Sequence, residues 1–130
     1  MSAQISAPRR ILIVEDSEDV REVLQELLQM EGHQVDTAMD GTAALEMAPR
    51  FDPNIVLIDI GLPGISGYDV ARGLRAQFGE TVTLIALTGF DSPEDRQRIV
   101  EARFNAHLVK PIEPGALERL IAGDLAPAAG

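Results

Sequence analysis

Five polar residues stand one or two positions after apolar runs that have the length of β-strands: Glu15, Asp16, Asp59, Thr88 and Lys110. If these runs are parallel strands of one sheet, their carboxyl ends share an edge, where open parallel sheets hold ligands. The three carboxylates would repel one another there, and a divalent cation would relieve the repulsion. An all-oxygen site favours Mg²⁺, with Mn²⁺ as the alternative ion. We therefore expect Glu15, Asp16 and Asp59 to bind Mg²⁺.

Asp59 is the carboxylate that we expect to react. It ends the apolar run 55–58 and precedes a loop rich in glycine, so a buried strand delivers it to a turn. A metal alone requires no lysine or threonine nearby, but a phosphoryl group needs a cation, a hydroxyl and N–H donors for its oxygens. Asp59 would then be the nucleophile that forms an acyl phosphate. Lys110 would pair with one phosphoryl oxygen, and Thr88 with the Gly89 N–H would contact another.

Each of these residues has a plainer interpretation when it is taken alone. Glu15 and Asp16 are typical of a helix cap, Thr88 of a turn, and Lys110 with Pro111 of a strand exit. Their joint placement after separate strands favours the functional interpretation.

The strands that must position these residues are expected at 11–14, 34–38, 55–58, 82–87 and 106–109. Amphipathic helices alternate with them, which predicts right-handed crossovers and a doubly wound α/β fold with a parallel sheet covered on both faces. The first, third and fourth strands are continuously apolar and suit the interior of the sheet, whereas the second and fifth suit its edges. This pattern favours the strand order 2-1-3-4-5.

The first helix is expected to begin at a cap formed by Asp16 or Ser17 and to end at Gly32. Its apolar residues recur at helical spacing and predict one buried stripe. The stripe consists of Val20, Val23, Leu24, Leu27 and Leu28.

The second helix is expected to begin after Asp40 and to end before Pro49, because Pro49 and Pro53 would bracket the approach to the next strand. The fourth helix has few apolar residues and is expected to be the least anchored. The remaining helices are expected at 67–78, after Asp91 or Ser92, and from Pro114.

Composition excludes several classes of function. The 130 residues suit one domain, and the formal charge of −10 disfavours binding to nucleic acid or to a membrane surface. The absence of cysteine removes disulfides and thiolate chemistry and fits a cytoplasmic protein. We expect a flexible N-terminus at 1–8, a folded domain at 9–125 and a flexible tail or truncated linker at 126–130, in a monomer or weak dimer.

Four short motifs carry a resemblance to a known family. They are VEDS at 14–17, DIGLPG at 59–64, LTG at 87–89 and LVKP at 108–111. Together they resemble the receiver domain of two-component response regulators, in the right order and over nearly the whole chain. The phrasing is similar to receivers of hybrid sensor histidine kinases. The chain would be a single-domain regulator or a receiver cut from such a kinase.

The resemblance implies a flavodoxin-like (βα)5 fold, Mg²⁺, and phosphorylation of Asp59 by a phosphohistidine on a sensor histidine kinase or a histidine phosphotransfer protein. It implies that the Gly61 carbonyl is a further metal ligand and that the Lys110–Pro111 peptide bond is cis. It also implies a protein switch, not an enzyme, which contacts an unknown downstream protein through the fourth helix, the fifth strand and the last helix.

Three features depart from the family pattern. His107 stands where many receivers carry the aromatic residue that switches together with Thr88, and a half-exposed histidine on an edge strand is an equally good interpretation. Arg103 stands where a glycine commonly ends the fourth helix, so this helix would end differently or be strained. Gly61 and Phe90 occupy the positions that tune hydrolysis. Neither can orient a water, which predicts a long-lived phosphoryl group.

Three other functions fit the sequence less well. A degenerate receiver would act only as a docking module, but all five site residues are present. An aspartate-nucleophile phosphatase usually carries a second acid two residues after the nucleophile, where this chain has Gly61. A flavin or nucleotide carrier would need a glycine-rich loop after the first strand, where Glu15 and Asp16 would repel a phosphate.

Overall fold

The computed structural model describes residues 8–89 and 92–123. Its strands are β1 (Arg10–Val14), β2 (Gln34–Ala38), β3 (Ile55–Asp59), β4 (Thr83–Thr88) and β5 (Ala106–Val109). Its helices are α1 (Glu18–Met30), α2 (Gly41–Phe51), α3 (Gly67–Phe78), the short 3₁₀ helix η2 (Gly79–Thr81), α4 (Pro93–Glu101) and α5 (Pro114–Ile121). All five strands are parallel and pair in the order β2-β1-β3-β4-β5, which confirms the predicted fold class.

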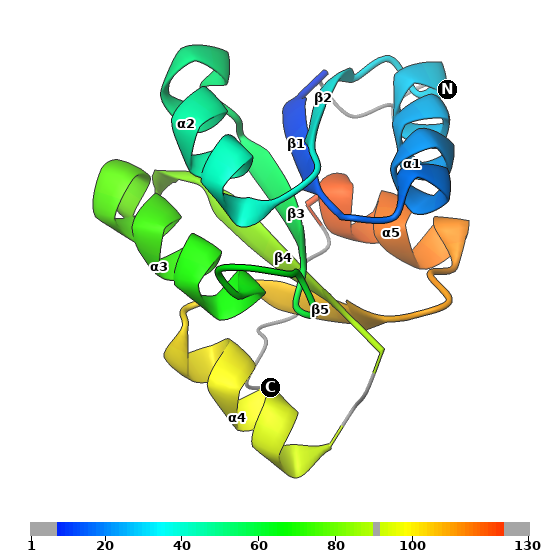
Figure 1. The fold of residues 1–130 in the computed structure, drawn as a ribbon. Coiled ribbons are helices and arrows are strands. Elements are labelled where there is room, and N and C mark those ends of the chain that lie inside the picture. Colours follow the sequence, from blue (N-terminus) through cyan, green and yellow to red (C-terminus); the bar gives the residue numbers. More distant parts are fainter. Residues whose placement is uncertain (1–7, 90–91, 124–130) are drawn as a thin grey trace.

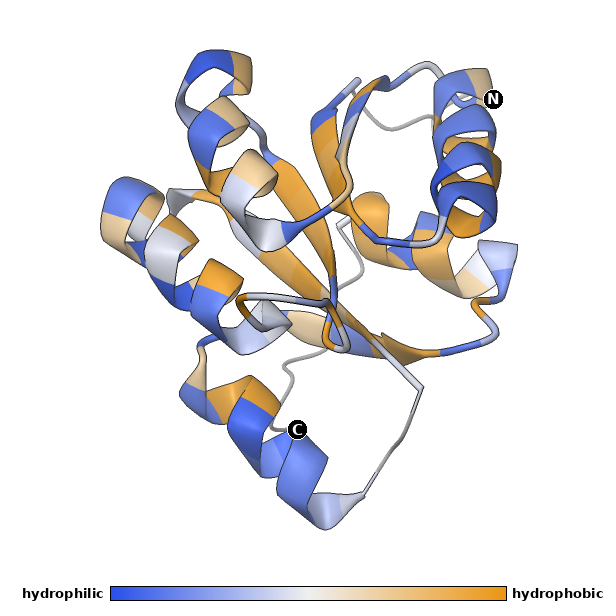
Figure 2. Ribbon diagram, viewed as in Figure 1, coloured by the Kyte–Doolittle hydropathy of each residue, from blue (hydrophilic) through white to orange (hydrophobic). Residues whose placement is uncertain are grey.

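The sheet is covered on both faces (Figure 1). Side chains that point to one face pack with α2, α3 and α4, and those that point to the other pack with α1 and α5. The central strand β3 is buried along its whole length, whereas the edge strand β2 alternates between exposed and half-buried positions and is buried at its last residue, Ala38. Figure 2 shows the same difference as a hydrophobic centre of the sheet under helices with hydrophilic outer faces. Continuous apolar runs therefore mark the strands that two layers of helices cover.

Helix α1 begins where the sequence predicts, but its buried face is narrower. The Ser17 side chain accepts from the Val20 N–H and caps the helix, and Gly32 just beyond it has a φ of +95°. Leu24 and Leu28 are buried against the sheet. The inclusion of Val23 in the buried stripe was wrong, because this residue is 64% exposed.

Helix α2 continues through Pro49, so the prediction that this proline precedes the next strand was wrong. Proline has no N–H and leaves the carbonyl of Leu45, four residues earlier, without its helical partner. The Gln77 side chain of α3 donates to that carbonyl at 3.4 Å. The helix instead ends at Phe51 and is followed by the cap residue Asp52, which has a φ of +54°.

Helix α4 is attached to the domain by few apolar contacts, as the sequence predicts. Ile99 is the buried side chain of the helix, and Ser92 is its cap, whereas the alternative cap Asp91 lies outside the described residues. Arg103 follows the helix with a φ of +65°, the left-handed conformation that favours glycine. The buried Arg75 stabilises this end, since its Nε and Nη2 donate to the Arg103 carbonyl at 2.9 and 2.7 Å.

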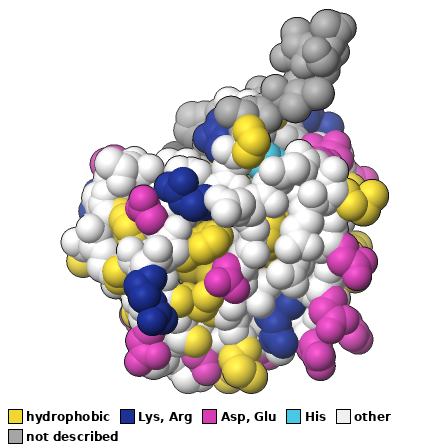
Figure 3. Space-filling view, turned by 90° about the horizontal axis from the view of Figure 1, so that it is seen from above, with side chains coloured by type: hydrophobic (Ala, Val, Ile, Leu, Met, Phe, Trp, Pro, Cys, Tyr) yellow, Lys and Arg dark blue, Asp and Glu magenta, His cyan; other side chains and the backbone are white. Residues whose placement is uncertain are grey.

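On the face that Figure 3 shows, the acidic residues are unevenly distributed. Figure 3 shows Asp and Glu side chains gathered along the edge of the molecule where α1 lies. Within residues 8–89 and 92–123, no helix has the length and apolar character needed to cross a bilayer. The predicted flexible segments fall almost entirely on residues 1–7 and 124–130, which lie outside the described part of the chain.

Candidate functional site

The carboxyl ends of the strands bring the candidate residues to one edge of the sheet. Glu15 and Asp16 follow β1, Asp59 and Thr88 end β3 and β4, and Lys110 follows β5. The carboxylates of Glu15, Asp16 and Asp59 each offer an oxygen atom within 4.8 Å of the others. The register explains this proximity, because β1 and β3 are neighbours at the point where the chain connections change direction.

Lys110 is the cation that joins two of these carboxylates. Its Nζ lies 2.9 Å from Glu15 Oε1 and 3.3 Å from Asp59 Oδ2. Burial alone would lower the pKa of Lys110, but the hydrogen bond to Glu15 and the negative charge of Asp59 outweigh burial, so the net shift is upwards. The ammonium is therefore charged throughout the physiological pH range.

Glu15 is the most buried acid of the site, with 1% of its surface exposed. Burial raises its pKa, although the hydrogen bonds from Lys110 and from the Ser17 N–H act in the opposite direction. One ammonium does not balance three carboxylates, so the cluster keeps an excess of negative charge. A small divalent cation with oxygen ligands would neutralise this excess, and the donor set fits Mg²⁺.

Asp59 is held by the backbone around it and is 7% exposed. Its Oδ1 accepts from the Gly61 N–H at 2.9 Å, and its Oδ2 is the atom that faces Lys110. Helix α3 begins close against it. A Cβ on Gly67 would lie only 2.5 Å from the Asp59 carbonyl oxygen, so a side chain there would displace the helix. The first residue of α3 must therefore be glycine for this packing.

Thr88 and Gly89 lie beside the cluster at the end of β4. Thr88 is buried, and its carbonyl accepts from the Lys110 N–H at 2.7 Å, which ties the ends of β4 and β5 together. Gly89 is exposed, and the position that a Cβ would take has no neighbour within 4 Å in the described part of the chain, the adjoining residues aside. The Lys110–Pro111 peptide bond is cis.

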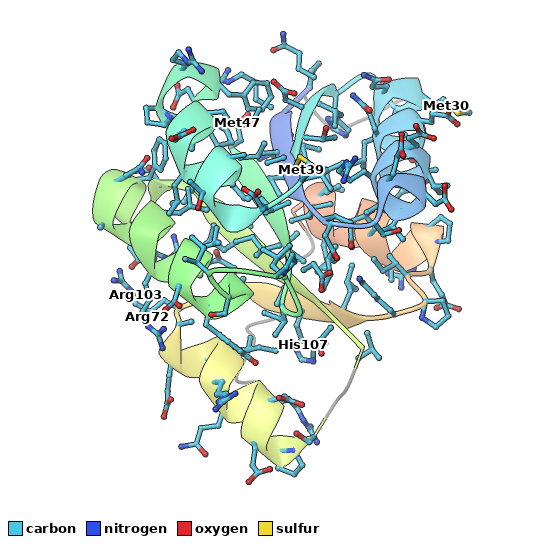
Figure 4. All side chains as sticks on the ribbon, viewed as in Figure 1. Met30, Met39, Met47, Arg72, Arg103 and His107 are labelled. Carbon is cyan, nitrogen blue, oxygen red and sulfur yellow. The ribbon has the colours of Figure 1, made fainter. Side chains whose placement is uncertain are left out.

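His107 is half-buried on the edge strand β5. It lies opposite Ala86 in the register, and Ala86 belongs to the face that α2, α3 and α4 cover. Figure 4 shows His107 between the sheet and α4. Gly61 is exposed above Asp59, whereas Phe90 lies outside the described residues.

Arg21 is a residue at this site that sequence reasoning missed. It lies in the first turn of α1, and its Nη1 donates to the backbone carbonyls of Glu15 at 3.0 Å and Asp16 at 3.2 Å. A basic residue in the first turn of a helix opposes the helix dipole, and that local conflict was the available signal.

An apolar groove of about 330 Å³ adjoins the site. It lies between the start of α1 and the segment that follows β5. Its lining residues include Val20 and Val23 from α1, and Lys110, Pro111 and Ile112 from the other side. Val23, which the sequence predicts to be buried, is therefore exposed on a surface next to the reactive centre.

The comparisons with known proteins agree on one family. The response regulator receiver domain family matches residues 11–122. An uncharacterised 14.6 kDa protein of Leptolyngbya boryana is 35% identical over 119 residues, which cover 91% of each chain. Response regulator MprA of Mycobacterium leprae is 38% identical over 113 residues, which cover 87% of this chain and 48% of MprA. The chain thus spans about half the length of this relative.

Solved structures show the same fold. The Vibrio cholerae chemotaxis protein CheY4 superposes with a TM-score of 0.84 at 30% identity, over 88% of this chain and 97% of CheY4. The receiver domain of the Pseudomonas aeruginosa sensor histidine kinase PA1611, with a magnesium ion in its active site cleft, superposes with a TM-score of 0.80 at 34% identity, over 88% of this chain and 95% of that domain. An origin of this chain in a hybrid kinase stays a prediction. By family match, relatives and fold, this chain belongs to the response regulator receiver domains of two-component signalling.

Proposed function

We propose that Asp59 accepts a phosphoryl group from a phosphohistidine on a sensor histidine kinase or a histidine phosphotransfer protein, and that Mg²⁺ assists the transfer. One observation carries the proposal: Lys110 Nζ bridges Glu15 and Asp59 inside a cluster of three carboxylates. This arrangement leaves one buried carboxylate oxygen beside a fixed cation and an excess of negative charge that a divalent ion would neutralise.

In the transfer, an Asp59 carboxylate oxygen attacks phosphorus as the N–P bond of the donor breaks. The bonding electron pair returns to the imidazole nitrogen, which then takes a proton from solvent. Lys110 would pair with one phosphoryl oxygen, while the Thr88 hydroxyl and the Gly89 N–H would bind another. Mg²⁺, held by Glu15, Asp16, Asp59 and the Gly61 carbonyl, would neutralise charge on the phosphoryl group.

The donor protein would rest on the apolar groove that adjoins the site. Lys110 forms part of both the groove and the carboxylate cluster, so a partner seated on Val20, Val23, Pro111 and Ile112 would bring its histidine next to Asp59. The groove is mostly apolar, which suits the apolar face of a partner helix.

The output would be a change in protein contacts through α4, β5 and α5. Helix α4 has a single buried side chain, Ile99, so a small force can displace it. Val100 and Val109 are 40% and 41% exposed and would form part of the contact surface. Thr88 would move towards the phosphoryl group, and His107, which faces α4, would transmit the movement.

The phosphoryl group would be long-lived, because Gly61 has no side chain to orient an attacking water and Phe90 would shield the group. The test is the decay rate of the phosphorylated protein carrying Phe90→Glu. A faster decay is expected, and an unchanged rate would reject the shielding by Phe90.

The phosphorylation itself is tested by incubation with Mg²⁺ and acetyl phosphate, followed by intact mass analysis. We expect a gain of one phosphoryl group that requires Mg²⁺ and is lost in Asp59→Asn. Asp36→Asn, on the exposed edge strand β2, is the matched control and should still gain the mass. Failure of the wild type with acetyl phosphate and with phosphohistidine donors would favour a docking module instead.

A further inference from the structure

Arg21 lies in the first turn of α1 and reaches back over the turn that carries the acidic pair. Its Nη1 donates to the Glu15 carbonyl at 3.0 Å and to the Asp16 carbonyl at 3.2 Å. Because Nη1 carries two hydrogens, it can make both bonds at once. One guanidinium nitrogen therefore fixes two successive peptide groups at the point where β1 turns into α1.

These bonds complete a set that holds the turn from several sides. The Glu15 N–H donates to the Ala38 carbonyl at 3.1 Å, and the Ser17 N–H donates to Glu15 Oε2 at 3.1 Å. With its carbonyls engaged by Arg21, the turn cannot rotate freely. The carboxylates of Glu15 and Asp16 then stay within reach of Asp59.

The charge of Arg21 does not explain its location. A positive charge in the first turn of a helix opposes the helix dipole, and α1 otherwise opens with Glu18 and Asp19. A guanidinium beside the acidic cluster also repels an incoming cation. The two hydrogen bonds to the backbone are therefore the favourable contribution of this residue.

We propose that Arg21 is a positioning residue for the divalent cation and preorganises Glu15 and Asp16 through their backbone. The inference rests on the proposed function in one respect, that the acidic cluster binds Mg²⁺. Charge and positioning make opposite predictions for the removal of the guanidinium. Loss of a nearby positive charge should tighten Mg²⁺ binding, whereas loss of the two hydrogen bonds should weaken it.

The experiment compares the Mg²⁺ dissociation constants of the unphosphorylated wild type and Arg21→Met, measured by competition with Mn²⁺ followed through water proton relaxation. Removal of groups that orient metal ligands typically weakens metal binding by about 10- to 100-fold, and we expect a loss of at least about tenfold. Arg21→Lys keeps the charge but loses the planar guanidinium group. Its affinity for Mg²⁺ should lie between those of the wild type and Arg21→Met. Arg50→Met, on the exposed end of α2, removes the same charge elsewhere and should leave the affinity unchanged.

Circular dichroism and urea unfolding show whether each variant is folded, and should Arg21→Met fail to fold, the comparison is made with Arg21→Lys. Weaker binding in a folded Arg21 variant, with Arg50→Met unchanged, supports the positioning role. Equal or tighter binding in the folded variant overturns it and leaves the proposed function standing. Absence of Mg²⁺ binding by the wild type overturns both.

Discussion

Replacement of Lys110 by methionine tests the electrostatics of the site without any phosphodonor. The substitution keeps an apolar stem of similar length and removes the ammonium that lies 2.9 Å from Glu15 and 3.3 Å from Asp59. Both acids are buried, at 1% and 7% exposure, so they would face each other without a counter-charge. The variant should therefore be less stable than the wild type when both acids are ionised.

The size of the loss follows from the burial of the pair. Breaking a fully buried ion pair costs about 3–5 kcal/mol. The Lys110 side chain is 29% exposed, so solvent screens part of the interaction. We therefore expect Lys110→Met to lower the free energy of unfolding by about 2–3 kcal/mol at pH 7.5 in the absence of divalent ions. Addition of Mg²⁺ should recover part of it, because an ion in the cluster replaces the missing positive charge.

The loss must also depend on pH in a defined direction. Burial raises the pKa of Glu15 in the folded state, and removal of Lys110 should raise it further. At a pH below 4.5, the ordinary pKa of Glu15 and its value in the unfolded state, the Glu15 carboxyl is protonated in both the folded and the unfolded state. The substitution then costs little stability. As the pH rises through the higher folded pKa, the ionised form becomes costly and stability is lost.

The assay is urea unfolding of the wild type and Lys110→Met at pH 7.5 and at about pH 4.5, followed by circular dichroism. Arg50→Met serves as the control for net charge. An equal loss at both pH values, or no loss at pH 7.5, would refute this account of the carboxylate cluster.

Three further perturbations test the packing and the buried polar groups of the domain. Tyr68→Phe should raise the free energy of unfolding, measured by urea unfolding, by about 1 kcal/mol, because the buried Tyr68 hydroxyl has no hydrogen-bond partner among the described residues; a lower stability would contradict this. His33 accepts the Arg9 N–H at 3.0 Å through Nδ1, and burial, then the charge of Arg9, lowers its pKa. Stability should therefore fall as the pH drops below about 6.5. If His33→Gln leaves the pH dependence of stability in that range unchanged, the titration of His33 is not its cause. Gly67→Ala should cost about 3 kcal/mol or more and slow phosphorylation, since its Cβ would overlap the Asp59 carbonyl; normal stability and rate would reject the close-packing argument.

Much of the fold could be predicted because local and global preferences agree. The β-branched run before Asp59 reads as a buried strand, and the structure buries it on both faces. The convergence of Glu15, Asp16 and Asp59 followed from strand order alone, because parallel strands place their carboxyl ends on one edge. The apolar character of the strands was thus sufficient to predict that these three acids lie close together.

The errors arose where tertiary contacts override local preference. Pro49 normally stops a helix, but the Gln77 side chain from α3 supplies the missing donor, and that contact is invisible in a local pattern. Val23 has the spacing of a core residue, yet it lines the groove with Pro111, far away in the sequence. The role of Arg21 depends on carbonyl positions that only the folded turn defines.

The most direct test of the central claim is a crystal structure of the protein with Mg²⁺ and beryllofluoride, which mimics a phosphoryl group on a carboxylate. We expect beryllium on a carboxylate oxygen of Asp59, with Mg²⁺ bound by Glu15 and Asp16, and with Lys110 and Thr88 in contact with fluorine atoms. Beryllofluoride absent from Asp59, or a metal ion bound away from Glu15 and Asp16, would contradict the proposed site.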